Sequence, residues 1–591
     1  MSAPNATATN GHAPPGDLPS LAALFLIKFD LKVGYTITWK RSRPDLELDG
    51  AVEFKSLPSG LHSVKEDLVY FVHEQYVGLS AFINDPASEA ERNAHLVAVG
   101  ILVPLSQGRL GRSWLHAQRL RELAKLLAHD TTKTEPLEQY WTANSAERSA
   151  DTPENELSET SSTVSRPPPS VLRKKKSYAR DRGLSNVTAF HPTHETLDVA
   201  HPALSIIKYI DTFGPLVFPL LRLALLRKRV LFITPPPVRL ACEFVYDLSI
   251  LSTIPSSVTD VLPPGSEPLQ RLRSLFTVGI HDIPKLQEDA SKHESAKLSN
   301  EPLEEGNWSP GWAACTTDEV LAIKTNLYDV TVELPAQVES SIEEKRWPRI
   351  KTAAGREIKA TQRDLRRFRI LHAELRKTQR HSVEMPRAEE QESDEESDDD
   401  NAALLGSSPR AESNCGGDEE VYADNLIEAS TWAALAYSGF MWWASAGEKD
   451  ASFSEEADRD RALVGDLSDF MTMSHASHAS LRSSDEAMAQ TWYQGATAPH
   501  TAIIAYFHRV TAEIFSTLGD IVDAADDEDH GSDGDDGGDS VVVHGDDVSR
   551  MGLDVWSESD KDFVQEVLQM YFGRRADVHG GSIECCGIKI C

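Results

Sequence analysis

Two long acidic segments divide this 591-residue chain and limit how much of it can pack into a core. Residues 389–400 contain nine Asp or Glu and residues 523–547 contain eleven, and neither segment has a Lys or Arg. The formal net charge is −33, and without these twenty carboxylates it would be −13. Such segments cannot bury enough apolar surface to offset the entropy lost on ordering. The sequence therefore predicts several folded blocks separated by solvated linkers.

Charge and composition exclude several classes of protein. A strongly acidic chain lacks the basic footprint that nucleic acid binding requires, so no nucleic acid partner is expected. Six cysteines in so long a chain make no disulfide framework. Residues 1–20 contain no Lys or Arg, and the apolar run 21–27 is too short for a secretory signal. The apolar stretch 429–447 includes Ser, Thr and Gly, which favours a buried helix over a membrane span. We expect a cytoplasmic protein.

The first block, residues 18–142, has the pattern of an antiparallel sheet followed by a helix. The helix is indicated by Leu120, Leu123 and Leu127, which fall on one face. Strands that run into a helix in this way predict an α+β layer. The strands are expected over residues 21–31, 35–39, 68–72, 76–82 and 95–105.

The second block, residues 200–335, alternates helices with short apolar strands. A helix around residues 218–227 leads to a strand at 230–234, and three prolines end that strand. Further strand-like runs are expected at 275–280 and 320–334, with an insertion at about 286–307. This alternation predicts an α/β fold with a mostly parallel sheet.

The last third of the chain is expected to be helical and interrupted. We expect a basic helix in residues 345–380, which contain thirteen Lys or Arg and three acids. A C-terminal helix over residues 560–572 has Ser557 as a cap, and a strand follows it. The remaining expected segments are a helical region with a flexible insert at 422–522 and a helix and strand at 548–591. Disordered segments are expected at 1–17, 143–199, 384–421 and 523–547.

The chain carries no motif for catalysis, cofactors or metals that we can identify. It lacks G-x-x-x-x-G-K-[ST], G-x-G-x-x-G and G-x-S-x-G. The loop after residues 230–234 holds three prolines, which have no N–H to donate to a phosphate. The spacing of Cys585, Cys586 and Cys591 fits no zinc pattern, so these cysteines are expected to pack. We therefore predict no catalytic, cofactor-binding or metal-binding residue, and a protein that is not an enzyme.

Two groups of residues are candidate regulatory or contact sites. Ser393 and Ser397 are each followed by three consecutive acids, which fits acidic-directed phosphorylation, although such patterns are common in acidic tracts without any regulated role. Arg366, Arg367 and Arg369 lie in the basic segment and could contact an anionic membrane surface or a partner. The alternative is an exposed helix that the neighbouring acidic tract neutralises.

Several strings of the sequence resemble DENN-domain proteins of the LCHN-like subgroup, the family of DENN domain-containing protein 11. Residues 24–30 (LFLIKFD), with the following Lys-Val-Gly and Trp39, look like the first hairpin of a longin module. The last third resembles a long C-terminal region of fungal relatives. The core of the resemblance comprises residues 52–60 (VEFKSLPSG), 67–71 (DLVYF), 218–220 (FPL), 225–231 (LLRKRVL) and 314–319 (ACTTDE).

This resemblance implies a longin-like module, then an α/β DENN core, then helices. It also implies guanine-nucleotide exchange on a Rab-type small GTPase in membrane traffic, at the cytoplasmic face of endomembranes. The family supplies no catalytic side chain and no cofactor, so no residue inherits a named role. The alternative is a non-catalytic scaffold or tether of the traffic machinery built on the same surfaces.

Overall fold

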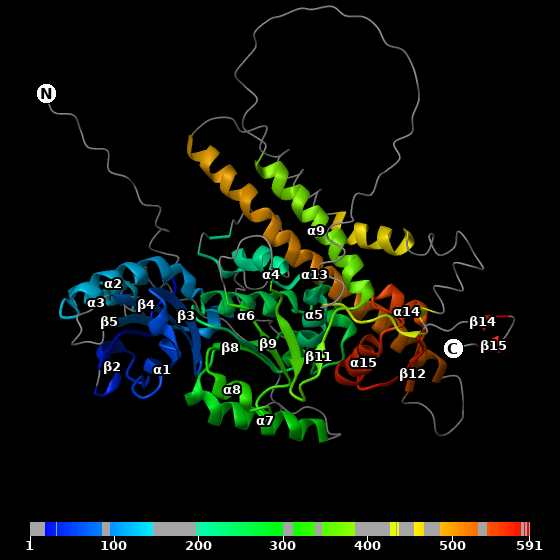
Figure 1. Cartoon of the computed structure of the whole chain (residues 1–591), viewed down its shortest axis with the longest axis horizontal. Coiled ribbons are helices and arrows are strands. Elements are labelled where there is room, and N and C mark those ends of the chain that lie inside the picture. The colour runs from blue at the N-terminus through cyan, green and yellow to red at the C-terminus, as the bar shows by residue number, and fades with distance from the viewer. Residues whose placement is uncertain are drawn as a thin grey trace, which may run out of the picture.

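The computed structural model describes residues 18–30, 32–85, 95–145, 197–198, 200–298, 311–336, 346–383, 426–432, 434–435, 454–465, 485–529, 540–580, 584–585 and 588–589 (Figure 1). The candidate phosphorylation sites Ser393 and Ser397 lie outside the described residues, as do residues 1–17 and most of the predicted linkers 143–199 and 384–421. Of the apolar stretch 429–447, only 429–432 and 434–435 are described, and Trp432 is exposed.

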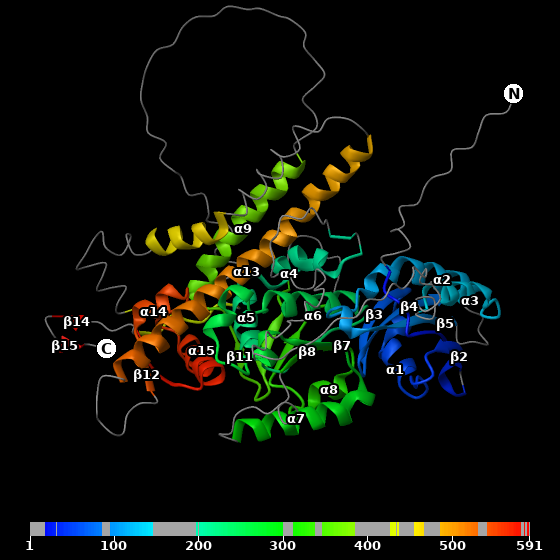
Figure 2. The same ribbon diagram turned by 180° about the vertical axis from the view of Figure 1, so that it is seen from behind.

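The N-terminal lobe, residues 21–145, is a five-stranded antiparallel sheet with helices on both faces. Its strand order is β3-β4-β5-β1-β2, so β1 lies inside the sheet and its first five residues are buried. Figures 1 and 2 show α2 and α3 on one side of these strands and α1 on the other. The expected strands and the helix with the leucine stripe are confirmed. The elements are β1 (Ala23–Asp30), β2 (Gly34–Ser42), α1 (Val52–Ser56), β3 (Glu66–His73), β4 (Tyr76–Asp85), β5 (His95–Pro104), α2 (Ala117–His129) and α3 (Glu135–Asn144).

The core lobe, residues 200–358, is built on a sheet that is mostly parallel, as expected. Strands β9, β6, β8 and β7 are neighbours in that order and pair in parallel, and β10 and β11 extend the sheet with antiparallel pairs. Helices α4, α5 and α6 cover one face, and α7 and α8 lie below the other (Figure 1). The elements are α4 (Ile206–Phe213), α5 (Val217–Leu225), β6 (Val230–Ile233), α6 (Arg239–Leu251), β7 (Arg273–Thr277), α7 (Ile283–Leu298), β8 (Trp312–Thr316), α8 (Glu319–Ile323), β9 (Val330–Glu333), β10 (Arg349–Thr352) and β11 (Glu357–Ile358).

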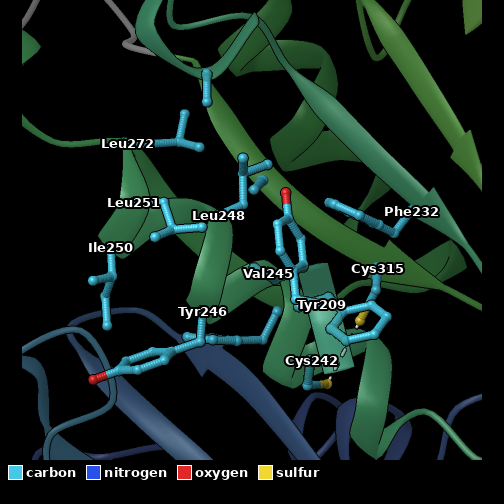
Figure 3. Close-up of a cluster of buried hydrophobic side chains, with 14 of the residues drawn as sticks. Tyr209, Phe232, Cys242, Val245, Tyr246, Leu248, Ile250, Leu251, Leu272 and Cys315 are labelled. Atoms are coloured by element: carbon cyan, nitrogen blue, oxygen red, sulfur yellow. Dashed lines mark hydrogen bonds between the residues drawn. The ribbon is translucent and has the colours of Figure 1, made fainter. Parts of the chain in front are cut away.

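The two lobes share one sheet because β3 and β7 meet. Phe71 of β3 pairs with Phe276 of β7, and this pairing joins five strands and six strands into a single sheet of eleven. Most buried apolar side chains of both lobes belong to one continuous cluster, and a second, smaller cluster lies within the core lobe around Trp312. Inside the larger cluster, the sulfur atoms of Cys242 and Cys315 lie 3.5 Å apart and point toward each other (Figure 3). Burial raises the pKa of the Cys315 thiol well above its usual value, which keeps the thiol protonated.

The C-terminal unit, residues 426–580, packs against the core lobe together with α9. Helices α13 and α9 run side by side above the core, and α14 and α15 lie beside α5 (Figures 1 and 2). Strand β12 pairs in parallel with β13. The elements are α9 (Gln362–Val383), a helix at residues 454–465, α13 (Asp485–Asp529), β12 (Ser540–Val543), α14 (Gly545–Arg550), α15 (Glu558–Val567), its continuation Leu568–Phe572, β13 (Arg575–Val578), β14 (Glu584–Cys585) and β15 (Ile588–Lys589).

Four local expectations differ from the structure. The strand β8 was not expected, and residues 320–334 hold helix α8 before the short strand β9. The expected insertion at 286–307 begins inside helix α7. Residues 349–358 form β10 and β11, so the basic helix begins only at Gln362. The acidic segment 523–547 is ordered at both ends, because α13 runs to Asp529 and β12 begins at Ser540.

One helical stretch in the described part of the chain, Pro202–Leu225, is long and apolar enough to cross a membrane. In its most apolar window 72% of the residues are buried inside the protein, which is the behaviour of a core helix. Phe218, for example, packs its ring against Phe507 of α13. The length and apolar composition of Pro202–Leu225 are therefore explained by its burial in the protein core.

Candidate interaction surface between the two lobes

Helix α1 of the N-terminal lobe is fixed directly onto the core lobe. The ring of Phe54 stacks on His281, with ring centroids 3.9 Å apart and planes inclined by 20°. The next residue, Lys55, places its Nζ 2.8 Å from Oδ1 of Asp282, and both side chains are largely buried. Lys55 also donates to the carbonyl of Val72 in β3 at 2.8 Å. The short turn Ile280–Asp282, which follows β7, is therefore a contact point between the lobes.

A buried carboxylate at the start of β3 caps a helix of the core lobe. Asp67 accepts the backbone N–H groups of Val238 at 2.7 Å and Arg239 at 3.2 Å, at the beginning of α6. An acid suits this place because a helix N-terminus has unpaired N–H groups and partial positive charge. Burial raises the pKa of Asp67, and these N–H groups hold the rise in check. The predicted proline loop lies alongside, where Pro236 faces Gly60.

Exposed apolar side chains gather beside this contact point. Ile280 is 47% exposed, and Val320 and Ile323 on α8 are 45% and 79% exposed. The turn and α8 are held together because Oδ2 of Asp318 accepts the N–H of Ile280 at 3.3 Å. We call Phe54, Ile280, His281, Val320 and Ile323 the junction patch. It combines side chains of both lobes, since Phe54 comes from the N-terminal lobe and the other four residues come from the core lobe.

The junction patch contains no acidic, hydroxyl or thiol side chain. Its side chains are aliphatic or aromatic, with one imidazole stacked on Phe54. In the part of the chain that the structure describes, no group of three or more His, Cys, Asp or Glu is placed to hold a metal ion. The loop after β6 consists of prolines, so its backbone cannot cradle a phosphate with N–H groups.

The three candidate contact arginines of α9 do not form one exposed face. Arg367 is only 2% exposed, because its guanidinium lies against Asp460 and donates to the carbonyl of Gly552 at 3.1 Å. Arg366 is partly buried and donates to Glu456 at 3.1 Å. Arg369 is exposed. Arg367 therefore cannot contact a membrane in this fold, and such a contact stays a prediction for the exposed part of α9.

Sequence reasoning missed a buried ionic cluster that binds the C-terminal unit to the core. Arg222 of α5 forms two hydrogen bonds with Asp364 of α9, at 2.8 and 2.7 Å, and its Nε lies 3.1 Å from Asp560 of α15. Burial alone would lower the pKa of Arg222, but the two carboxylates outweigh it and raise the pKa. Burial raises the pKa of Asp560 to about 7 against the pull of Arg222. No short motif could have revealed partners this far apart in sequence.

A cleft of approximately 970 Å³ lies at the other end of the large sheet, beside its edge strand β11. Its walls come from the start of α9, residues 428–435, and the loop between α14 and α15. The lining is mixed, with Glu428, Asp554 and Asp562 among the acids, Arg356 among the bases, and Trp556 among the apolar groups. The cleft is separate from the junction patch.

Comparison with known proteins gives two family matches and a set of relatives. Residues 24–344 match the family model of DENN domain-containing protein 11, and residues 427–591 match a domain of unknown function, DUF4484. DENN domain-containing protein 11 of Xenopus laevis is 30% identical over 323 residues, which cover 53% of this chain and 59% of that protein. The Danio rerio protein of the same name is 29% identical over 325 residues, 53% of each chain. "Uncharacterized protein ANR2" of Saccharomyces cerevisiae is 23% identical over 602 residues, covering 97% of this chain and 95% of that protein. The chain thus spans little more than half the length of these vertebrate relatives.

Proposed function

We propose that this chain, which belongs to the family of DENN domain-containing protein 11, promotes guanine-nucleotide exchange on a Rab-type small GTPase in membrane traffic. The junction patch would form part of the surface that holds the GTPase. The observation that carries the proposal is the joining of two lobes into one sheet, with the half-buried Phe54 of the N-terminal lobe stacked beside exposed apolar side chains of the core lobe. The first lobe then corresponds to a longin-like module, with the strand order β3-β4-β5-β1-β2.

Exchange needs differential binding and no acid or base. A ligand shifts an equilibrium only as far as it prefers one state, so the protein must bind the nucleotide-free GTPase better than the loaded form. A nucleotide held at nanomolar affinity represents about 12 kcal/mol. Opposing that requires a rigid, shape-matched interface of at least about 1,000 Å². A surface that spans two lobes joined at Phe71 and Phe276, and tied again by Lys55 and Asp282, supports such rigidity.

The experiment measures release of fluorescent GDP from a panel of purified Rab-type GTPases by the full-length chain. The whole chain is needed because the C-terminal unit completes the core; for example, the hydroxyl of Tyr571 donates to the carbonyl of Leu225 at 2.6 Å. Fragment 18–335 would lose these contacts. We expect acceleration of GDP release from at least one GTPase, at the cytoplasmic face of endomembranes in the cell.

Charged substitutions in the junction patch test the surface directly. Ile323→Asp and Val320→Asp should each slow exchange roughly thirtyfold, the loss expected when a central interface contact of about 2 kcal/mol is removed. Val33→Asp is the matched control, since Val33 is 74% exposed on the distant β1–β2 turn. Equal activity of all three variants would remove the junction patch from the proposal. Tight GTPase binding without faster release would replace the exchange factor with a scaffold or tether.

A further inference from the structure

A short segment of the C-terminal unit is attached to both the core and α15 at the cleft. Ala360, just before α9, pairs with Ile427, and the two backbone hydrogen bonds of this pair are each 2.8 Å. On the other side the carboxylate of Glu428 accepts two serine hydroxyls from the start of α15. Oγ of Ser557 is 3.2 Å from one carboxylate oxygen, and Oγ of Ser559 is 3.3 Å from the other. The segment Leu426–Thr431 therefore forms one wall of the cleft.

The carboxylate of Glu428 lies near charges of both signs, because Arg222 lowers its pKa and Asp364 raises it. Two buried carboxylates, Asp364 and Asp560, already share the guanidinium of Arg222 close by. Burial raises the pKa of Glu428, and the hydroxyls of Ser557 and Ser559 oppose that rise by donating hydrogen bonds. Two neutral hydroxyl groups therefore hold a third carboxylate in place.

Only one of these two serines is accessible to another protein. Ser557 occupies the N-cap position of α15 and is 5% exposed, but its hydroxyl makes no capping hydrogen bond, contrary to the expectation from sequence. Ser559, in the first turn of the helix, is exposed. The sequence after Ser559 is Asp560-Lys561-Asp562, and the acid at the third following position, Asp562, is exposed, whereas Asp560 is buried against Arg222. Ser393 and Ser397 also have an acid at the third following position.

We propose that Ser559 is a phosphorylation site for an acid-directed protein kinase, and that the phosphate releases Leu426–Thr431 from α15. In the reaction, Oγ of Ser559 takes the γ-phosphoryl group of ATP, ADP leaves, and the hydroxyl proton passes to solvent. The modification replaces a hydrogen-bond donor to Glu428 with a group of about −1.5 to −2 charge. Attraction across 3.3 Å then becomes repulsion.

Release would widen the cleft, because Glu428 and Ser559 both line it. Because Ser559 lies in the first turn of α15, the helix N-terminus also attracts the phosphate, and this attraction opposes the repulsion from Glu428. The inference does not depend on nucleotide exchange, since it concerns the opposite end of the sheet from the junction patch.

The first experiment tests the site. Full-length protein carrying Ser393→Ala and Ser397→Ala is incubated with a purified acid-directed kinase and ATP, and its peptides are analysed by mass spectrometry. One phosphate is expected on the peptide that contains Ser559, and Ser559→Ala should abolish it. A protein that gains no phosphate at Ser559 would overturn the proposed site.

The second experiment tests the release of the segment by hydrogen exchange. In Ser559→Glu, amides of residues 426–431 should exchange at least about tenfold faster, because local opening becomes easier. Glu428→Gln added to Ser559→Glu should restore slow exchange, since it removes the repelling carboxylate. Ser549→Glu is the control, because it adds the same charge to the cleft from α14. If the amides of residues 426–431 exchange at the wild-type rate in both the phosphorylated protein and Ser559→Glu, the proposed release of the segment is refuted.

Discussion

Replacing Arg222 with Met should destabilise the protein strongly, and more at high pH than at low pH. Arg222 is almost fully buried and contacts Asp364 twice and Asp560 once. Its removal leaves two carboxylates, 1% and 0% exposed, without their shared cation. Breaking a buried ion pair from one side costs about 3–5 kcal/mol. A whole protein has only about 5–15 kcal/mol of stability, so the variant should be close to unfolding.

The pH dependence follows from the pKa of Asp560. Burial raises this pKa to about 7 in the folded protein, from a usual value of 3.8. Because the pKa of Asp560 is higher in the folded protein than in the unfolded chain, a protonated Asp560 favours folding. This contribution to stability is complete below pH 4 and is lost as the pH rises through 7. Without Arg222 the pKa of Asp560 rises further, because the opposing charge is gone. At pH 5.5 Asp560 of the variant can take up a proton readily, whereas at pH 8 its protonation costs more free energy.

Urea unfolding followed by tryptophan fluorescence at pH 5.5 and pH 8 measures the effect. Arg459→Met is the control, because its ion pair with Glu455 is exposed and should contribute under about 1 kcal/mol. Adding Asp364→Asn and Asp560→Asn to Arg222→Met should recover much of the loss, since no buried charge then remains. A loss below 1 kcal/mol at both pH values, or a larger loss at pH 5.5, would refute this account of the cluster.

Three further predictions concern the N-terminal lobe and α9. In Gly78→Ala the new methyl group would lie 2.1 Å from the ring of Phe71, so soluble yield should fall sharply, and Phe71→Leu in the same chain should restore part of it. Arg369→Glu should weaken flotation with anionic liposomes about fivefold, if α9 contacts membranes, and the weakening should fade at high salt; Arg367→Glu should instead lower the melting temperature, because that side chain is buried. Burial lowers the pKa of His116 to about 4, so the stability that its neutral form provides is lost as the pH falls from 6.5 toward 4. The free energy of unfolding, measured with urea, should therefore decrease between pH 7 and pH 5 by about 2 kcal/mol less in His116→Gln than in the wild type.

The local elements of the fold could be predicted where one face of a strand or helix is buried. Leu120, Leu123 and Leu127 repeat at helical spacing, and the structure buries all three in α2. Strand β8 was missed because its sequence, WAACT, is short and has few β-branched residues, although it is fully buried between β6 and β7. Local patterns report burial well only when the segment is long enough to show a period.

The candidate site could not be predicted because it depends on contacts between distant segments. Ile280 and Ile323 are ordinary apolar residues in the sequence, and only the folded chain leaves them exposed beside α1. The same limit explains the error about Arg367. Arg363 and Arg367 lie four residues apart on one face of α9, and that face meets Asp460 of the helix at 454–465. From sequence alone, a basic helix face is interpreted as exposed to solvent. The acidic residue that covers it comes from a distant segment and is known only from the structure.

The hydrogen bond between Tyr571 and Leu225 has a consequence for the newly made chain. Its two residues are 346 positions apart. At about 5–20 residues per second, a ribosome would need roughly 20–70 s to synthesise the intervening segment. Until then α5, whose residues are nearly all buried in the finished protein, has no C-terminal unit to cover it. The nascent chain should therefore expose the apolar helix α5 for roughly 20–70 s, which makes it a substrate for chaperones that shield such surfaces.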